Sequence, residues 1–317
     1  GVVLDGTTID AGTGNVDVFG TGQRDVAGII ANAGSIASAG GAVLFDGRSE
    51  GGDGVRMDGF GIASGGGDIS ILGYGDGIGV YAEYADLDSG GGNIVVHGEG
   101  GTGNGVDMSA LLASGGGGIS VYGSSTDAAG LVFGDGYYAG MTSSGGDIEL
   151  EGHGATGGVA LYAGSYGSSA IDSGGGDITV TGTASAAGAI GVYSDGVDLI
   201  GGAGDVTVDG SAPSGIGILL ANRAGVSTTT GAIALIGTGA TFGLDIADGA
   251  IDTDSGDISL TGTALDPAAT AGVRVAGGGV IRVPSRWRPS PGGRTQPRSG
   301  RMSNCVSCFG FAPFGIV

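Results

Sequence analysis

Short stretches in which apolar and polar side chains alternate recur along most of the chain. Each follows a glycine-rich turn, usually begins with Asp or Asn, and continues as apolar-x-apolar-x-Gly, as in Asp68–Gly73. A period of two is the pattern of a strand that has one buried face. We therefore expect Ile69 and Ile71 to point into the core. By the same alternation, Ser70 and Leu72 should point outward.

The alternating motif occurs ten times at a nearly constant interval. The glycines that close the ten copies are Gly20, Gly47, Gly73, Gly98, Gly123, Gly152, Gly182, Gly210, Gly237 and Gly262. Successive closing glycines lie 25 to 30 residues apart, or about 27 on average. A fixed period of this length indicates a repeat protein, in which one unit buries its apolar face only by stacking on the next.

Two further apolar steps follow the first in each repeat. A second strand is predicted at 55–57, 78–80, 106–108, 159–161, 244–246 and 273–275. A third, shorter step is predicted at Ile62, Leu87, Leu112, Met141, Ile171, Leu199, Val226 and Ile251. Three strands in each repeat predict an all-β parallel β-helix of about ten three-sided coils. A sandwich or barrel would need two-residue hairpin turns between strands, and the sequence does not show them.

Glycine accounts for 78 of the 317 residues, which is typical of either a disordered chain or a repeat rich in tight turns. Disorder requires low hydrophobicity, whereas 40% of these residues are hydrophobic and the mean hydropathy is +0.29. A core can therefore be buried, and we expect the glycines to be turn residues between apolar segments.

The charge is strongly negative over most of the chain. All 32 acidic residues precede Arg282, together with five arginines, so residues 1–281 carry 5 − 32 = −27. Such a surface repels nucleic acid and anionic membrane, and no stretch is long and apolar enough to span a bilayer. We expect neither a nucleic-acid partner nor membrane insertion.

The composition changes abruptly at the end of the repeats. Residues 282–317 hold six of the eleven arginines, five of the seven prolines, the only tryptophan and both cysteines, Cys305 and Cys308. We therefore divide the chain into a β-helix region, 1–281, expected to be an internal fragment of a longer protein, and an aberrant tail, 282–317. The tail is either a disordered basic segment whose cysteine pair binds metal or is redox-active, or the product of a shifted reading frame.

The Ser-Gly-Gly-Gly-Asp-Ile-x-Val-x-Gly pattern, clearest at 64–73, 89–98 and 173–182, resembles the repeats of filamentous haemagglutinin-like exoproteins. The resemblance extends over residues 1–281. It implies a right-handed parallel β-helix, two-partner secretion through an outer-membrane transporter, and adhesion at the bacterial cell surface. Host glycans or surface proteins would then be the partners.

Acidic and amide side chains occupy equivalent turn positions in six repeats. These are Asp68, Asn93, Asp147, Asp177, Asp205 and Asp257. Stacked carboxylates repel one another, which a bound cation such as calcium would relieve. The alternative, which we favour because Gly118 and Ala232 interrupt the series, is an Asx turn in which each side chain accepts from nearby backbone N–H groups. We predict no metal site and no cofactor.

Two other sets of polar residues suggest chemistry. Asp147, Glu149 and Glu151 form an outward row about 7 Å apart, a separation that inverting glycosidases use. The simpler interpretation is a solvated strand face. The two histidines, His97 and His153, lie two repeats apart, which predicts roughly 10 Å along the axis, too far to share a metal.

Three tyrosines follow inward residues at the end of the second strand and should point outward: Tyr81, Tyr162 and Tyr193. Exposed aromatic rings can stack on sugars or anchor protein partners, so these are the predicted binding residues. No catalytic residue is predicted. The main hypothesis is a structural or adhesive shaft of a secreted or surface exoprotein. The alternative is a β-helical polysaccharide lyase or hydrolase, which should interrupt its coils with long loops.

Overall fold

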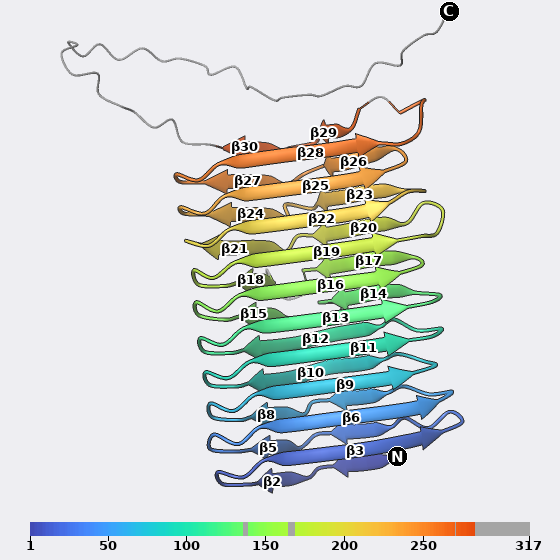
Figure 1. The fold of residues 1–317 in the computed structure, drawn as a ribbon, viewed down its shortest axis with the longest axis vertical. Helices are drawn as coiled ribbons and strands as arrows, with labels where there is room; N and C mark the ends of the chain where they lie inside the picture. Colours follow the sequence, from blue (N-terminus) through green and yellow to red (C-terminus); the bar gives the residue numbers. More distant parts are fainter. Residues whose placement is uncertain (136–138, 164–168, 270, 283–317) are drawn as a thin grey trace, which may run out of the picture.

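The computed structural model describes residues 1–135, 139–163, 169–269 and 271–282. In this part of the chain the regular elements are all β-strands, and every strand pairing is parallel. The chain runs along the front of the molecule, returns along the back, and rises by one strand at each circuit (Figure 1). The circuit is counterclockwise when viewed from the C-terminal end, so the β-helix is right-handed.

The ten repeated motifs form the front of the molecule as one ten-stranded sheet. Its strands are β3 (Val16–Gln23), β6 (Val43–Glu50), β9 (Ile69–Gly75), β11 (Ile94–Gly100), β13 (Ile119–Ser125), β16 (Ile148–Gly154), β19 (Ile178–Ala184), β22 (Val206–Ala212), β25 (Ile233–Gly239) and β28 (Ile258–Ala264). Each strand pairs with the corresponding strand of the coils before and after it. The predicted repeat is therefore the structural repeat.

The second and third strands of the coils form the back of the molecule as one twenty-stranded sheet. The second strands are β1 (Val2–Asp5), β4 (Ile29–Asn32), β7 (Val55–Asp58), β14 (Ala129–Phe133), β17 (Gly157–Tyr162), β20 (Ile190–Asp195), β23 (Ile216–Ala221), β26 (Phe242–Ile246) and β29 (Val273–Val275). The third strands are β2 (Thr8–Asp10), β5 (Ser35–Ala37), β8 (Gly61–Ala63), β15 (Gly140–Thr142), β18 (Ala170–Asp172), β21 (Asp198–Gly202), β24 (Gly225–Thr228), β27 (Ala250–Thr253) and β30 (Val280–Arg282).

Two coils depart from the three-strand plan. In these coils the second and third strands merge into β10 (Val80–Asp88) and β12 (Val106–Ala113). The pairing between them shifts register at Tyr84, a residue with a φ of 51°, as in a β-bulge. The strand predicted at 78–80 begins only at Val80, because the N–H of Ile78 instead bonds the Asp53 carboxylate, at 2.9 Å.

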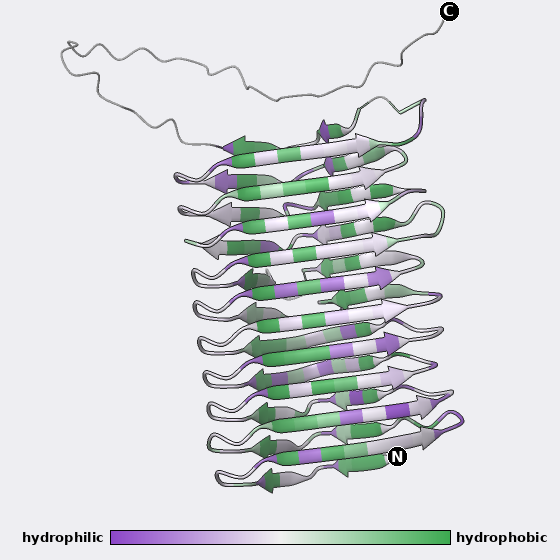
Figure 2. Ribbon diagram, in the orientation of Figure 1, coloured by the Kyte–Doolittle hydropathy of each residue, from purple (hydrophilic) through white to green (hydrophobic). Residues whose placement is uncertain are grey.

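The main core is one column of apolar side chains that runs through the coils, and a small second cluster comprises Ala184, Ala189 and Ala212. Ile69 and Ile71 are buried, while Ser70 and Leu72 on the same strand are partly exposed, so the predicted alternation is confirmed. Figure 2 shows these hydrophobic positions lined up from one front strand to the next. The residues of the main core form a continuous cluster from Ile29 to Ile251, as expected when stacked coils share one core.

The closing glycines do not lie in turns, as the sequence suggested, but inside the front strands. Gly98, for example, lies within β11 and is buried. A Cβ atom on Gly98 would lie 2.1 Å from the carbonyl oxygen of Gly105, where the same coil turns back towards the second sheet. Glycine is needed here because two backbone segments approach closely, not because of an unusual φ.

In five successive coils a buried serine begins the glycine-rich turn at the opposite edge of the front sheet. Ser89 is representative: its hydroxyl donates to the carbonyl oxygen of Gly92, at 2.6 Å, and lies 3.2 Å from that of Ser114. The first contact closes the turn and the second joins it to the next coil. Ser64, Ser114, Ser143 and Ser173 repeat the arrangement.

The described β-helix ends with β30 at Arg282, one residue beyond the predicted boundary. The predicted tail otherwise lies outside the described residues, including Cys305 and Cys308. The inward side chains of the first and last coils are only partly buried, as at Val18 and Leu260, because no coil covers them from that side.

Candidate binding face on the ten-stranded sheet

A column of stacked side chains crosses the outer face of the front sheet. Its members are Arg48, Tyr74, His97, Tyr122 and His153, one from each of five adjacent strands, β6 to β16. The Arg48 guanidinium carbon lies 4.6 Å from the centre of the Tyr74 ring. Ring centres are then 5.6, 4.6 and 5.7 Å apart along the column. We call these five residues the aromatic ladder.

The ladder forms because the strands pair in register. Arg48 lies opposite Tyr74, and His97 lies opposite Tyr122. The other two contacts are diagonal, since Tyr74 is paired with Glu99 and His153 is paired with Ser124. Neighbouring strands are about 4.8 Å apart, which is a suitable distance for aromatic contact.

Each histidine of the ladder contacts a carboxylate through its Nε2 atom. His97 Nε2 lies 3.0 Å from Glu99 Oε1. His153 Nε2 lies 2.7 Å from Glu151 Oε1, and its Nδ1 lies 2.6 Å from the hydroxyl of Thr183. The histidines are therefore partly buried members of one stack, and Tyr122 lies between them.

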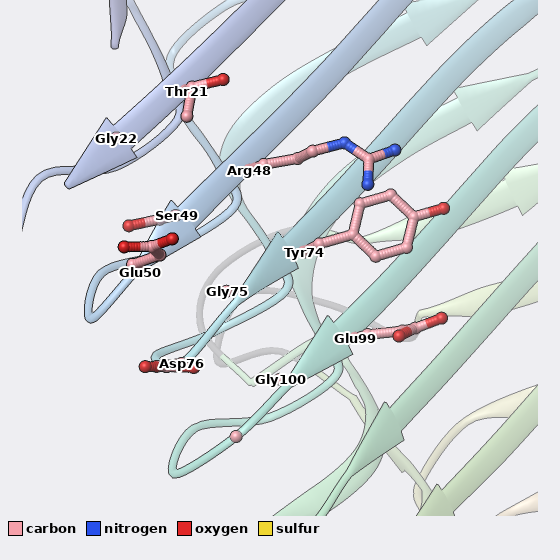
Figure 3. A pocket seen from close by; sticks show the side chains of 11 residues that line it. Thr21, Gly22, Arg48, Ser49, Glu50, Tyr74, Gly75, Asp76, Glu99 and Gly100 are labelled. Atoms are coloured by element: carbon pink, nitrogen blue, oxygen red, sulfur yellow. The ribbon is translucent and has the colours of Figure 1, made fainter.

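Two recesses lie beside the ladder, where the front strands end. The first has a volume of about 470 Å³ and is lined by residues of four coils, among them Arg48, Tyr74 and Glu99 (Figure 3). The second, of about 630 Å³, is lined by residues of five coils, including His153 and Ser211. Glu99 and Gly100 line both recesses. We call the two neighbouring recesses, taken together, the axial groove.

Several polar groups of the groove are free to bind a ligand. Within the described part of the chain, no protein group bonds the hydroxyls of Ser124, Ser185 and Ser211 in the second recess. Among the residues that line the first recess, the phenol O–H of Tyr74 and the carboxylate of Asp76 likewise have no hydrogen-bond partner in the described part of the chain. The Arg48 guanidinium is already engaged, because its Nε lies 3.2 Å from Asp46 Oδ1.

The outward acidic row does not form a pair of opposed carboxylates. Glu149 is exposed on β16, whereas Glu151 is held by His153. Asp147 accepts a hydrogen bond of 2.9 Å from the N–H of Asp177 in the next coil. Two of the three carboxylates thus have structural partners.

The predicted binding tyrosines lie on the back sheet, away from the groove, and do not form one platform. The rings of Tyr162 and Tyr193 meet edge to face, with centres 5.6 Å apart. Tyr81 lies on β10, three strand spacings from β17, with the Arg56 guanidinium 4.4 Å from its ring centre. Of the three tyrosines, only Tyr162 and Tyr193 are in contact with each other. The binding role of all three stays a prediction.

Carboxylates modify the acidity of these tyrosines. Burial and a 2.9 Å hydrogen bond to Asp195 raise the pKa of Tyr193 to about 12. A 2.6 Å hydrogen bond to Glu83, with burial, raises the pKa of Tyr81 to about 12. Both phenols are therefore neutral donors over the physiological pH range.

Comparison with known proteins finds no family model, no curated protein and no solved structure that matches this chain. Any function must therefore be argued from the chain's own residues and fold.

The turn acids form a ladder between coils, which differs from the Asx turns that we expected. Asp68 Oδ1 accepts from the N–H of Asn93, at 2.7 Å, and Asn93 Oδ1 accepts from the N–H of Gly118, at 2.9 Å. The same contact recurs in later coils. Asp147 accepts from the N–H of Asp177, Asp177 from that of Asp205, and Asp205 from that of Ala232. Because the next coil presents an unpaired N–H one strand spacing away, the side chain bonds that coil and not its own turn.

The described residues lack two further features: a metal-binding cluster and a membrane-spanning helix. They contain no grouping of three or more His, Cys, Asp or Glu side chains suited to a metal ion. Nor does this part of the chain contain a helix long and apolar enough to cross a membrane.

Proposed function

We propose that this chain is a shaft segment of a secreted or surface-anchored bacterial exoprotein that supports adhesion. An outer-membrane transporter would export it, and glycans or proteins of another cell surface would be its partners. The support comes from the repeat resemblance together with the uniform solenoid described above. The function is thus a mechanical and adhesive one, not catalysis.

The observation that carries the proposal is the continuity of the coils. The front strands pair without a register shift from β3 to β28, and one apolar core runs beneath them. A shaft needs this continuity because a load applied at one end passes through every coil. An enzyme of the same fold would be expected to interrupt the coils with long loops that build a site, and the repeat length varies only between 25 and 30 residues.

Surface exposure on the producing bacterium tests the proposal. Externally added protease should digest the protein on intact cells, and disruption of the gene for the outer-membrane transporter that we propose should leave the protein inside the cell. Cells that lack the protein should attach severalfold less to a host-cell layer. Retention of the protein in the cytoplasm of wild-type cells would contradict the proposal, as would unchanged attachment.

A further inference from the structure

We propose that the axial groove binds a linear, uncharged oligosaccharide laid along the axis of the β-helix. This inference rests on the proposed adhesive function and names the partner class for it. It places the ligand on the front sheet, not on Tyr81, Tyr162 and Tyr193 of the back sheet.

The length and direction of the groove fit a chain of sugars. The lining residues come from eight consecutive front strands, β3 to β22. Seven strand spacings of about 4.8 Å give a groove of roughly 34 Å. One spacing is close to the advance of one pyranose ring in an extended polysaccharide, so successive coils would meet successive sugars. An extended peptide advances about 3.3 Å per residue and would fall out of step with the coils.

The lining chemistry also fits sugar hydroxyls. Ser124, Ser185 and Ser211 offer hydroxyls that both donate and accept, and they have no protein partner among the described residues. Asp76 and Glu99 add carboxylate acceptors. Pairs of hydroxyls and carboxylates bind polyols well, since each sugar O–H can donate to one group and accept from another.

Hydrogen bonds, and not ring stacking, would hold the sugar. The faces of the Tyr74 ring are covered by Arg48 and His97, and those of His97 by Tyr74 and Tyr122. The ring edges remain, and Tyr74 lines the first recess. The aromatic ladder therefore makes a rigid wall for the groove.

The charged groups that line the groove favour a neutral ligand over an anionic or a cationic one. Glu50, Asp76 and Glu99 line the first recess, and its one guanidinium, Arg48, is paired with Asp46, so sulfated or uronic sugars would be repelled. A cationic peptide would need carboxylates along the whole groove. The second recess offers only Glu99 at its edge and is otherwise lined by uncharged groups and His153. A neutral polyhydroxylated ligand fits both recesses.

Glycan binding by the purified full chain tests the inference. An array of neutral and anionic oligosaccharides identifies the sugar, and calorimetry then measures its affinity, with a lysine hexapeptide as the cationic probe. Ser124→Leu removes a free hydroxyl and fills the second recess, so it should weaken binding at least tenfold. Tyr74→Phe keeps the ring and removes one hydrogen bond, so it should weaken binding roughly threefold to tenfold.

Ser120→Leu is the matched control. Ser120 lies on the same strand and face as Ser124, four residues before it and outside the groove, and should leave the affinity unchanged. Equal melting temperatures of the three variants would show that loss of binding is not loss of fold. The inference is overturned if the array retains no neutral glycan, if Ser124→Leu binds as the wild type does, or if the peptide binds and the sugars do not.

The test separates this inference from the proposed function. A surface-exposed protein that supports attachment without binding any neutral glycan would contradict only the groove assignment. Shortening of the bound oligosaccharide during incubation would confirm a glycan site in the groove. It would contradict the purely structural and adhesive role and favour the polysaccharide-degrading alternative.

Discussion

Single glycines determine how closely the two sheets approach at one edge. The closing glycines lie within the front strands and are buried in all coils but the last, and in several coils a Cβ atom would lie about as near to a carbonyl oxygen as in Gly98. For Gly182 the distance to the carbonyl oxygen of Gly191 would be 2.1 Å. Real Cβ atoms do not approach backbone so closely, so the strands would have to move apart.

Gly182→Ala should therefore be strongly destabilising, by about 2 kcal/mol or more in the free energy of unfolding. Gly61→Ala is the control, because Gly61 also lies in a strand but its nearest neighbour would be 3.9 Å from the new Cβ atom. Chemical denaturation of the two variants compares the effects. Equal stability of the two would show that the close approach at Gly182 is not a constraint.

The phenol of Tyr193 should titrate at about pH 12, well above the ordinary value of 10.0, because burial and Asp195 favour its neutral form. The native pKa is raised, so the stabilising contribution is present below pH 10 and is lost as the pH rises from about 10 to about 12. NMR of labelled tyrosine ring carbons measures the midpoint. Asp195→Asn should lower it, and a wild-type midpoint near 10 would contradict the assigned contacts.

Which residues line the core could be predicted from the sequence, but the aromatic ladder could not be. Alternation places Tyr74 and His97 on the outer face, yet they are 23 residues apart and meet only through strand register. Aligning the ten motifs on their closing glycines gives a usable signal, since Tyr122 then falls directly below His97. The turn acids were located correctly. Their bonding to the next coil depends on the stacking distance, which the sequence alone does not show.

The front strand is the element that the sequence describes best. It has one buried face, a turn before it and a glycine within it, and the same pattern returns ten times. The second and third strands are less regular, and in two coils they merge into β10 and β12. In β10 the merged strand also contains a bulge at Tyr84 with a positive φ, which is not evident from hydrophobic periodicity.

The strand register of the front sheet makes a sharp prediction at Ile178. This side chain is fully buried, so Ile178→Asp places an unpaired carboxylate in the core and should cost several kcal/mol. Thr179→Asp, at the next residue on the same strand, faces outward, and its main cost is repulsion from Glu149 on β16, so it should cost only about 1 kcal/mol. Thermal unfolding of both variants tests this pair. A shift in melting temperature that is larger for Thr179→Asp would mean that the strand faces the other way.

At the scale of the whole molecule, the coils form one solenoid whose length grows by one strand spacing per repeat. Residues far apart in sequence are therefore close in space when their coils are neighbours, and the distance between equivalent positions depends only on the number of coils between them. The continuous core, the turn ladders and the axial groove all follow from this translation. The proposed shaft function and the proposed glycan site depend on it equally.

Distances between equivalent outward positions test this translation most directly. Ser70, Thr179 and Ser259 are in register on the front sheet, with four strand spacings from the first to the second and seven from the first to the third. Spin labels can be attached at these sites as cysteine pairs in a chain whose Cys305 and Cys308 are replaced by serine. Pulsed electron paramagnetic resonance should give backbone separations of about 19 Å and about 34 Å, after allowance for the label arms. Separations that do not increase in proportion to the number of coils would contradict the β-helix and everything inferred from it.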